Sequence, residues 1–316
     1  MNITILDGYS INPGDLDWSD LASMGTLTVY DRTLPAEVLD RARDSEILLT
    51  NKVALDSDII NALPHLRYIG ILATGYNIVD IRVARLRGIP VSNVPSYSTM
   101  SVAQSVFALL LAFTNSTEHY SDEFHHGEWC RCPDFCFVNT DLTELAGKRL
   151  GIIGYGHIGK AVAQIGAAFG MQVCASSSKP QSEIPEVEKQ TIDEIFTTCD
   201  VVSLHCPLTD DTYHLADARR IALMKPDAIL INTARGPLVD EAALANALRQ
   251  GKIRGAGLDV LGQEPPAAYN PLIGAPRCIV TPHIAWATKE ARRRLIDIAS
   301  ANVRHFLAGD PQNIVN

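Results

Sequence analysis

A glycine-rich turn in the middle of the chain constrains its fold more than any other feature. The turn has the sequence GYGHIG at residues 154–159 and follows the apolar stretch 149–153, which is typical of a buried strand. A helical pattern continues from Ile158 to Phe169, and Gly170 ends it. A strand, a glycine turn and a helix in this order predict a dinucleotide-binding site. The physical reason is that a helix N-terminus offers free N–H groups and a partial positive charge to phosphates.

Each of the three glycines has its own role in such a site. Gly154 permits the tight turn, Gly156 lets a pyrophosphate approach the backbone, and Gly159 allows helix and strand to pack closely. The motif alone also occurs in purely structural turns, so the prediction depends on the strand and the helix around it. Because the motif lies in the middle of the chain, the residues before it must build a separate unit.

The first hundred residues alternate between short apolar runs and helical patterns. The apolar runs lie at residues 3–6, 26–30, 47–50, 68–71 and 90–92, and the helical stretches at 36–43, 56–62 and 81–87. This alternation is typical of β-α-β units with a parallel sheet. It is complete before the glycine turn begins, which predicts a first α/β layer of its own.

A long helix and a second α/β series follow. Ser101 and Gln104 have the spacing of a capping box, which predicts a helix from there to Phe113, and residues 125–141 are expected to form a loop. Further strands are expected at 149–153, 172–175, 201–204, 228–232, 255–259 and 278–281, with helices at 158–169, 192–197, 216–223, 241–249 and 289–307. The sequence therefore predicts an α/β protein with two Rossmann-like, doubly wound parallel-sheet domains.

Length and charge narrow the class of protein. A chain of 316 residues has room for about two domains. Its formal net charge of -9 argues against nucleic acid and anionic membrane surfaces as partners. No stretch approaches the ~18 consecutive apolar residues of a membrane span, and the N-terminus lacks the basic and apolar regions of a signal peptide. We therefore expect a cytoplasmic protein that binds neither nucleic acid nor membranes.

The seven cysteines include a cluster that could bind a metal. His125 and His126 precede Cys130, Cys132 and Cys136, and thiols and imidazoles are ligands for soft metals. The spacing fits none of the usual paired-ligand patterns, however, so we predict no metal site. Reduced thiols and a redox-labile loop are the favoured interpretation for a chain of this size.

Three segments carry polar residues at the ends of predicted strands, where an α/β sheet places its ligands. His283 is a candidate general acid and base, because imidazole titrates near neutral pH. Glu264 is a candidate partner that would orient this ring and favour imidazolium. Arg235 could polarise a keto oxygen and form a forked contact with a neighbouring carboxylate. Taken singly, His283 also fits a turn residue, Glu264 a loop cap and Arg235 a surface ion pair. Together they suit hydride transfer between a nicotinamide and a 2-keto acid.

The complete set of motifs resembles the D-isomer-specific 2-hydroxyacid dehydrogenases. The matching segments are the glycine turn, NTARG at 232–236, GLDV at 257–260, Glu264-Pro265 and Pro282-His283, and the resemblance covers the whole chain. The segments LDGY at 6–9, DFCF at 134–137 and HIAWA at 283–287 are most similar to the glycerate dehydrogenase (hydroxypyruvate reductase) branch.

This resemblance implies roles for individual residues. It implies a catalytic set of Arg235, Glu264 and His283, and a substrate carboxylate held by the backbone at Ala73, Thr74 and Gly75, with Arg235, His283 and Trp286 also facing the substrate. Implied cofactor contacts are Thr74, Gly154, Gly156, His157, Ile158, Gly159, Ser176, Ser177, Ser178, Lys179, Cys206, Thr212, Thr233, Ala234 and Asp259.

The resemblance also implies an architecture. A flavodoxin-like substrate domain would comprise residues 1–100 and 288–316, and the dinucleotide-binding Rossmann domain would be inserted as residues 101–287. Members of the family are usually homodimers.

The sequence departs from the family at the end of the second strand of the dinucleotide fold. Enzymes that use NAD place an acid there to accept from the ribose 2′-hydroxyl. Here residues 173–179 read VCASSSK, and Ser177 stands at the position of the acid. The hydroxyls and Lys179 could hold a 2′-phosphate instead, so we expect NADP rather than NAD, with a solvated turn of no preference as the alternative. His157 also stands where the family often has arginine.

The predicted function is an NAD(P)-dependent D-2-hydroxyacid dehydrogenase that reduces hydroxypyruvate to D-glycerate, with glyoxylate as a second candidate substrate. Within the family, the alternatives are a D-lactate or a phosphoglycerate type of dehydrogenase. A non-catalytic, dinucleotide-sensing interaction protein is the alternative from another class, because fold and retained residues do not by themselves establish turnover.

Overall fold

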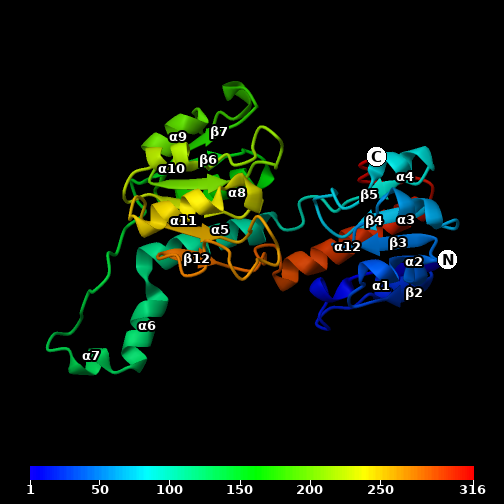
Figure 1. Ribbon diagram of the computed structural model, residues 1–316, viewed down its shortest axis with the longest axis horizontal. Helices are drawn as coiled ribbons and strands as arrows, with labels where there is room; N and C mark the ends of the chain where they lie inside the picture. Colours follow the sequence, from blue (N-terminus) through cyan, green and yellow to red (C-terminus); the bar gives the residue numbers. More distant parts are fainter. The chain divides into compact units, whose positions relative to one another are not determined.

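The computed structural model describes all 316 residues, and the chain forms two compact units. Unit 1 comprises Met1–Ser98 and Trp286–Asn316, and unit 2 comprises Thr99–Ala285 (Figure 1). Each unit contains one wholly parallel sheet with helices on both faces. The predicted fold class, two parallel-sheet α/β units, is therefore confirmed.

The sheet of unit 1 has the strand order β2-β1-β3-β4-β5, which is the flavodoxin-like order. Its strands are β1 (Asn2–Ile5), β2 (Thr26–Val29), β3 (Ile47–Thr50), β4 (Tyr68–Ile71) and β5 (Val91–Ser92). Every residue of the two central strands β3 and β4 is buried. Helices on both faces explain why these strands are continuous apolar runs rather than alternating ones.

The helices of unit 1 divide between the two faces of its sheet. They are α1 (Ser19–Ala22), α2 (Val38–Ala42), α3 (Ser57–Ala62), α4 (Ile81–Leu86) and α12 (Lys289–Leu307), with short 3-10 turns at Gly8–Ser10 and Pro35–Glu37. Helices α2, α3 and α4 pack in one core cluster, and α1 and α12 pack in the other. Figure 1 shows α12, in orange, running along the strands of the first hundred residues.

An ion pair between a buried arginine and an exposed aspartate ties α12 to the beginning of the chain. Arg292 is 8% exposed, and its two terminal nitrogens each lie 2.7 Å from an oxygen of Asp15. It also donates to the carbonyl of Ile11 at 3.0 Å. Hydrogen bonding by this guanidinium lowers the pKa of Asp15 to about 2. The C-terminal helix is thus an integral part of unit 1, which explains why this unit is built from two separate pieces of sequence.

The sheet of unit 2 has the strand order β12-β11-β10-β9-β6-β7-β8. Its strands are β6 (Arg149–Ile153), β7 (Gln172–Ser176), β8 (Glu188–Lys189), β9 (Val201–Leu204), β10 (Ile229–Asn232), β11 (Gly255–Leu258) and β12 (Cys278–Val280). Counted from β6, this is the Rossmann order 3-2-1-4-5-6 with one added strand. The order reverses between β6 and β9, which is the point where such sheets bind their ligands. The short strand β8 was not predicted, because only two exposed residues form it.

Five helices cover the sheet of unit 2. Helices α5 (Thr99–Asn115) and α8 (His157–Ala168) pack on one face, and α9 (Ile192–Thr198), α10 (Ala218–Leu223) and α11 (Glu241–Arg249) pack on the other. The predicted capping box at Ser101 is wrong, because α5 begins two residues earlier. Ser101 lies inside the helix, is buried, and donates its hydroxyl to the carbonyl of Ala285 at 2.6 Å.

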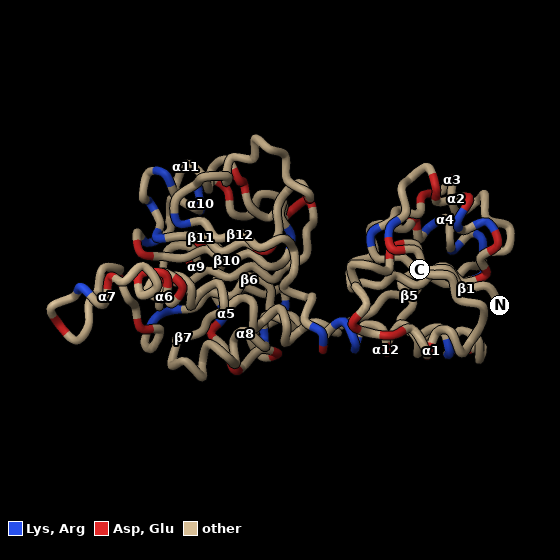
Figure 2. Tube along the Cα trace, turned by 90° about the horizontal axis from the view of Figure 1, so that it is seen from below, with Lys and Arg blue, Asp and Glu red and all other residues tan.

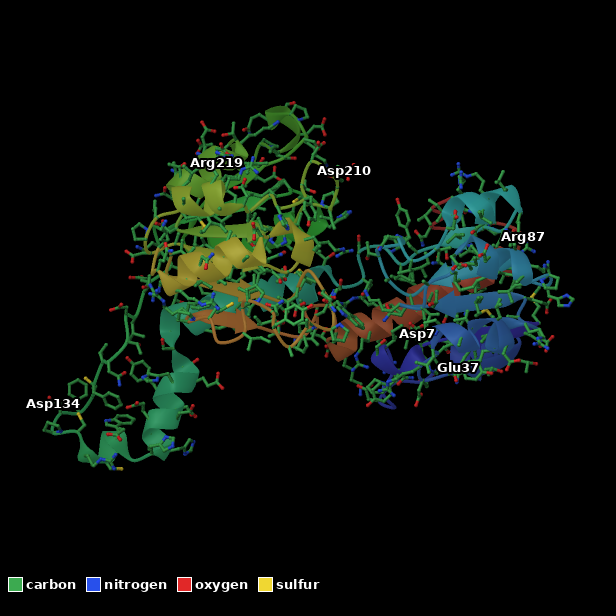
Figure 3. All side chains as sticks on the ribbon, viewed as in Figure 1. Asp7, Glu37, Arg87, Asp134, Asp210 and Arg219 are labelled. Carbon is green, nitrogen blue, oxygen red and sulfur yellow. The ribbon has the colours of Figure 1, made fainter.

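Residues 116–141 form a projecting segment, which we call the arm (Figure 1). The predicted loop is wrong in part: the arm contains α6 (Thr117–His125) and α7 (Glu128–Arg131). No residue of either helix is buried, so the apolar periodicity that marks a packed helix is absent from the sequence. Contacts within the arm hold it, including the Trp129 indole N–H that donates to the carbonyl of Phe135 at 3.0 Å. Figure 3 shows Asp134 on the loop beyond α7.

Acidic and basic residues are interspersed along the chain in both units (Figure 2). No single helix combines the length and the apolar character needed to cross a membrane; α5 with α6, bent by 56° at their junction, meets the criterion as a pair by length and composition only.

Candidate active site

The glycine turn lies at the point where the strand order of unit 2 reverses. Gly154 has a φ of +100°, and a Cβ atom there would lie 2.4 Å from the backbone nitrogen of Cys206, which follows β9. A Cβ at Gly159 would lie 2.3 Å from the carbonyl oxygen of Gly154. Both positions therefore require glycine for packing. Gly156 differs, since nothing lies within 4 Å of a Cβ built there, and the space over the turn is open.

Three observations at this edge of the sheet fit a dinucleotide. Helix α8 begins after Gly156 with no side chain capping it, so its first N–H groups are available to an anion. The open space over Gly156 adjoins these N–H groups. The hydroxyl of Thr233, directly after β10, is buried without a hydrogen-bond partner. A buried unpaired hydroxyl is costly, which favours a ligand that supplies the missing bond.

The end of β7 has the hydroxyl-rich character expected from the sequence. Ser176 and Ser177 are partly buried, while Ser178 and Lys179 are exposed. The Ser177 hydroxyl accepts from the backbone N–H of Lys179 at 3.1 Å, and Lys189 Nζ donates to the Lys179 carbonyl at 2.7 Å. This turn therefore combines hydroxyl groups with two lysines.

Several other predicted cofactor residues brace loops at the same edge of unit 2. The Thr212 hydroxyl donates to the carbonyl of Pro207 at 2.7 Å and accepts from the N–H of Thr209 at 2.7 Å. Burial raises the pKa of the Cys206 thiol to about 11, so this group remains protonated at neutral pH. His157, the first residue of α8, is exposed, and Ile158 is partly buried against the core.

His283 and Glu264 come together from two different loops. His283 Nδ1 lies 2.7 Å from Glu264 Oε2, and the other carboxylate oxygen of Glu264 accepts from the N–H of Leu261 at 3.0 Å. The side chains are 28% and 38% exposed, respectively. With Nδ1 engaged by the carboxylate, Nε2 is the ring nitrogen left for a substrate. This pairing of an imidazole with a carboxylate can move a proton.

Asp259 holds the loop that carries His283. It is 2% exposed, and its carboxylate accepts from the N–H groups of Ile284 (2.9 Å) and Ala285 (2.8 Å) and from the hydroxyl of Thr281 (2.6 Å). The His283 N–H donates to the Asp259 carbonyl at 2.8 Å. His283 has a φ of +55°, an uncommon conformation that these bonds stabilise. Sequence reasoning assigned Asp259 a cofactor contact and missed this supporting role.

Arg235 is exposed, and the loop beneath it is rigidly held. Its guanidinium donates to the carbonyl of Ala234 at 2.6 Å. Asn232 is fully buried, donates to the carbonyl of Arg235 at 2.8 Å and accepts from the N–H of Ala234 at 3.0 Å. A Cβ at Gly236 would lie 1.9 Å from the carbonyl carbon of Leu261, so the arginine loop lies directly against the loop that carries Glu264.

The remaining predicted residues lie in unit 1. Ala73, Thr74 and Gly75 follow β4, and this turn is fixed by Thr74, whose hydroxyl donates to the carbonyl of Val94 at 2.9 Å. The carbonyl of Ala73 accepts from the N–H of Val94 at 3.0 Å. Trp286 is partly buried in the core beside α12, with its ring edge-on to Tyr97 at 6.3 Å between centroids. Packing is therefore one role of Trp286.

The NAD binding domain of the D-isomer specific 2-hydroxyacid dehydrogenases matches residues 107–285. The hydroxypyruvate reductase of Blautia hydrogenotrophica is 46% identical over the full length of both chains. The glycerate dehydrogenase of Methylorubrum extorquens is 43% identical over 90% of each. The chain belongs to the D-isomer-specific 2-hydroxyacid dehydrogenase family. Its relatives place it in the glycerate dehydrogenase and hydroxypyruvate reductase branch, as the sequence motifs predict, and it is an NAD(P)-dependent oxidoreductase.

A solved structure extends the family comparison to the whole fold. An acyclic imino acid reductase in complex with NADPH and D-Arg has 32% identity and a TM-score of 0.88, with 100% of each chain covered. The family fold thus supports more than one type of acceptor, so the acceptor must be inferred from the site of each member.

One residue of this dehydrogenase escaped sequence analysis. His205 directly follows β9 at the reversal point, and its Nε2 lies 2.8 Å from the hydroxyl of Ser203. The backbone N–H of His205 donates to the carbonyl of Ile153 at 2.7 Å. Burial lowers the pKa of His205 to about 4, so the ring is neutral at pH 7. The sequence feature that could have identified His205 is its position at the end of an apolar strand, directly before Cys206, where sheets of this type bind ligands.

Proposed function

We propose that this dehydrogenase reduces hydroxypyruvate to D-glycerate, with glyoxylate as a second substrate. The observation that carries the proposal is the His283–Glu264 pair on the same sheet whose strand order reverses at the open glycine turn. The names of the relatives, hydroxypyruvate reductase and glycerate dehydrogenase, support the choice of substrate.

In the proposed mechanism, a bound nicotinamide dinucleotide supplies the hydride for the keto carbon. His283 Nε2 donates a proton to the keto oxygen as that oxygen gains charge, so the product is a neutral hydroxyl. Glu264 accepts from Nδ1 and stabilises the imidazolium before the proton leaves. The Arg235 guanidinium polarises the keto oxygen and binds the neighbouring carboxylate. Proton transfer by a positioned side chain contributes about 10²- to 10⁴-fold to the rate.

The remaining site residues have proposed binding roles. The N–H groups around Ala73, Thr74 and Gly75 would bind the substrate carboxylate, in a turn that Val94 already holds in place. Trp286 would contact the substrate. In this proposal, residues 1–100 and 288–316 form the substrate domain, and residues 101–287 form the cofactor domain.

We infer a preference for NADPH over NADH. A carboxylate at position 177 would repel a 2′-phosphate, and serine stands there instead. Lys179 and Lys189 add positive charge to the same turn, and Lys179 is exposed. The NADPH complex of the related imino acid reductase supports NADPH as a cofactor of this fold.

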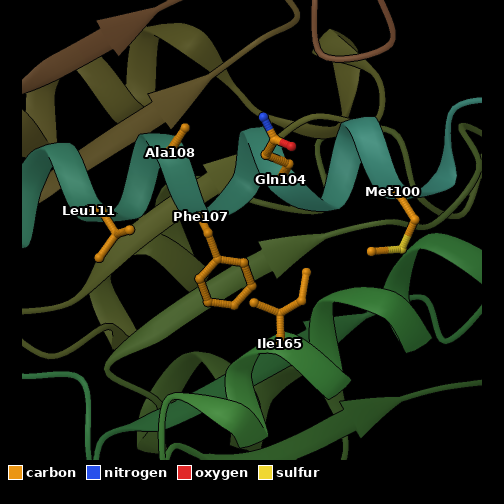
Figure 4. A pocket seen from close by; sticks show the side chains of 6 residues that line it. All are labelled: Met100, Gln104, Phe107, Ala108, Leu111 and Ile165. Carbon is orange, nitrogen blue, oxygen red and sulfur yellow. The ribbon is translucent and has the colours of Figure 1, made fainter. Parts of the chain in front are cut away.

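We further infer a homodimer in the cytoplasm. The arm exposes Phe124, Trp129 and Phe135, which are 52%, 51% and 89% accessible. Unit 2 also has an apolar groove between α5 and α8, lined by Met100, Gln104, Phe107, Ala108, Leu111 and Ile165 (Figure 4). Exposed aromatic side chains and an exposed apolar groove are typical of an interface. All seven cysteines are free, which suits a reducing compartment.

Light scattering tests the assembly. Trp129→Glu should yield a monomer at a concentration where the wild type is a dimer, whereas Leu86→Glu, at an 82% exposed leucine of α4, should leave the dimer intact. A dimeric Trp129→Glu protein would contradict a role for the arm.

The activity is tested by following oxidation of NADH and NADPH in parallel with hydroxypyruvate. We expect turnover with hydroxypyruvate, faster with NADPH, and loss of turnover in His283→Ala with the affinity for NADPH retained. Activity only with pyruvate or a phosphorylated acid would favour the D-lactate or phosphoglycerate type. Cofactor binding with no turnover on any 2-keto acid would favour the sensing protein.

A further inference from the structure

Glu241 forms a bridge that catalysis by the His283–Glu264 pair does not by itself require. It is the first residue of α11, and its Oε1 accepts from the N–H of Gly262 at 2.6 Å. Its Oε2 accepts from Asn270 Nδ2 at 2.8 Å. Helix α11 already has a cap, because the Asp240 side chain accepts from the N–H of Ala243 at 3.0 Å. The contacts of Glu241 are therefore directed at the loop between β11 and β12 rather than at its own helix.

Glu241 holds the peptide next to the one that orients Glu264. The N–H of Leu261 donates to Glu264 Oε1, and the next N–H, that of Gly262, donates to Glu241. The Leu261–Gly262 peptide also abuts Gly236, where a Cβ would lie 1.9 Å from the Leu261 carbonyl carbon. The Leu261–Gly262 peptide is thus fixed by the Glu241 carboxylate and by the backbone of the arginine loop, and the N–H of the preceding Val260–Leu261 peptide holds Glu264.

Glu241 also lies close to the strand that leads to His283. The pKa of the Cys278 thiol, in β12, is raised to about 11, first by burial and second by the negative charge of Glu241. Negative charge is favourable at the N-terminus of a helix, where α11 places this carboxylate. One side chain therefore connects α11, the Glu264 loop and the neighbourhood of β12.

We propose that Glu241 is a positioning residue for the catalytic pair. It fixes the Leu261–Gly262 peptide, this peptide positions the adjoining Leu261 N–H that holds Glu264, and Glu264 fixes the ring of His283. Because α11 follows directly on the loop of Arg235, Glu241 also couples the arginine loop to the glutamate loop. The role assigned to Glu241 rests on the proposed function, in which Glu264 and His283 perform the proton transfer.

Two substitutions distinguish the effect of the length of the Glu241 side chain from the effect of its charge. Glu241→Asp keeps the charge at the helix N-terminus but is one methylene too short to hold Gly262. Glu241→Gln loses the charge and the bond from Asn270 Nδ2, but its amide oxygen still accepts from the Gly262 N–H. Glu194→Asp is the matched control, since Glu194 lies in the first turn of α9, bonds to the N–H of Thr191 and is remote from the loop.

We expect Glu241→Asp to lower kcat by about 10- to 100-fold, the cost of a small misplacement of reacting groups. The fall in kcat/KM at high pH should begin at lower pH, because a displaced Glu264 supports imidazolium less well. The affinity for NADPH should not change. Glu241→Gln should stay within about threefold of wild type, since the bond from the Gly262 N–H is kept, and Glu194→Asp should match wild type.

Hydrogen–deuterium exchange provides a readout independent of turnover. The amides of Leu261 and Gly262 should exchange faster in Glu241→Asp than in wild type, and at the wild-type rate in Glu241→Gln. Wild-type kcat and pH profile in Glu241→Asp, or equal loss in both variants, would overturn the positioning role. A wild-type protein without turnover would refute the proposed function instead, and the exchange data would still decide whether Glu241 fixes the loop.

Discussion

Substitution by alanine should have different effects at Gly156 and Gly159, although these glycines lie three residues apart in one turn. At Gly156 it should weaken cofactor binding, and at Gly159 it should lower stability. Gly156 has a φ of -88° and a ψ of -159°, which alanine adopts readily, and an added methyl group meets no protein atom within 4 Å. A methyl group at Gly159 would lie 2.3 Å from the Gly154 carbonyl oxygen and 3.1 Å from Ile152. The first substitution therefore occupies the space of the ligand, and the second disrupts the fold.

The magnitudes follow from these contacts. Gly159→Ala must push α8 away from β6, and overpacking of this kind costs about 1–3 kcal/mol of unfolding free energy. Gly156→Ala should leave stability unchanged or raise it by about 0.5 kcal/mol, because alanine restricts the unfolded chain. Its methyl group keeps a pyrophosphate from the helix N–H groups. Losing hydrogen bonds to a charged group, about 1.5–3 kcal/mol, corresponds to a roughly 10- to 100-fold rise in the Kd of NADPH.

Urea unfolding and fluorescence titration with NADPH measure the two effects separately. We expect Gly159→Ala to unfold at lower urea concentration and Gly156→Ala to bind NADPH weakly while unfolding like wild type. Wild-type affinity in Gly156→Ala would refute the argument that the open space over this glycine holds the pyrophosphate. Wild-type stability in Gly159→Ala would refute the packing argument.

Three further predictions concern specificity, pH and thiols. Ser177→Asp should shift the kcat/KM ratio from NADPH toward NADH by at least about tenfold, since it restores an acceptor for a 2′-hydroxyl and repels a phosphate; an unchanged ratio would contradict the assignment. His205 has a folded pKa of about 4, below the unfolded value near 6.5, so its unfolded form binds the proton first and stability should fall by about 3 kcal/mol as pH drops through this window. Urea unfolding between pH 4 and 7 should show a shallower decline in His205→Asn, and an equal decline would exclude this residue as the cause. A thiol reagent should rapidly modify Cys130, Cys132 and Cys136 in the native protein, because Cys174 and Cys199 are buried and burial raises the pKa of the Cys206 and Cys278 thiols to about 11. Rapid modification of all seven would contradict the described packing.

Local sequence patterns were sufficient for most of the two sheets. Strands such as β3 and β4 are uninterrupted apolar runs, because both of their faces are buried. The same logic failed for the arm, whose helices bury nothing and so leave no periodic signal. It also failed at Ser101, where capping-box spacing is produced by a buried serine that bonds to Ala285, 184 residues away in sequence.

The sequence by itself determined the glycine turn and the α/β class, and it supplied the residues that we propose carry the chemistry. These features are local, since strand periodicity, glycine geometry and the chemistry of a side chain are contained in a few consecutive residues. Only the tertiary structure decided that Glu264 meets His283, that Asp259 holds the loop of His283, and that Glu241 reaches Gly262. Such contacts join strand ends that are distant in sequence, and the order of the strands in the sheet brings them together.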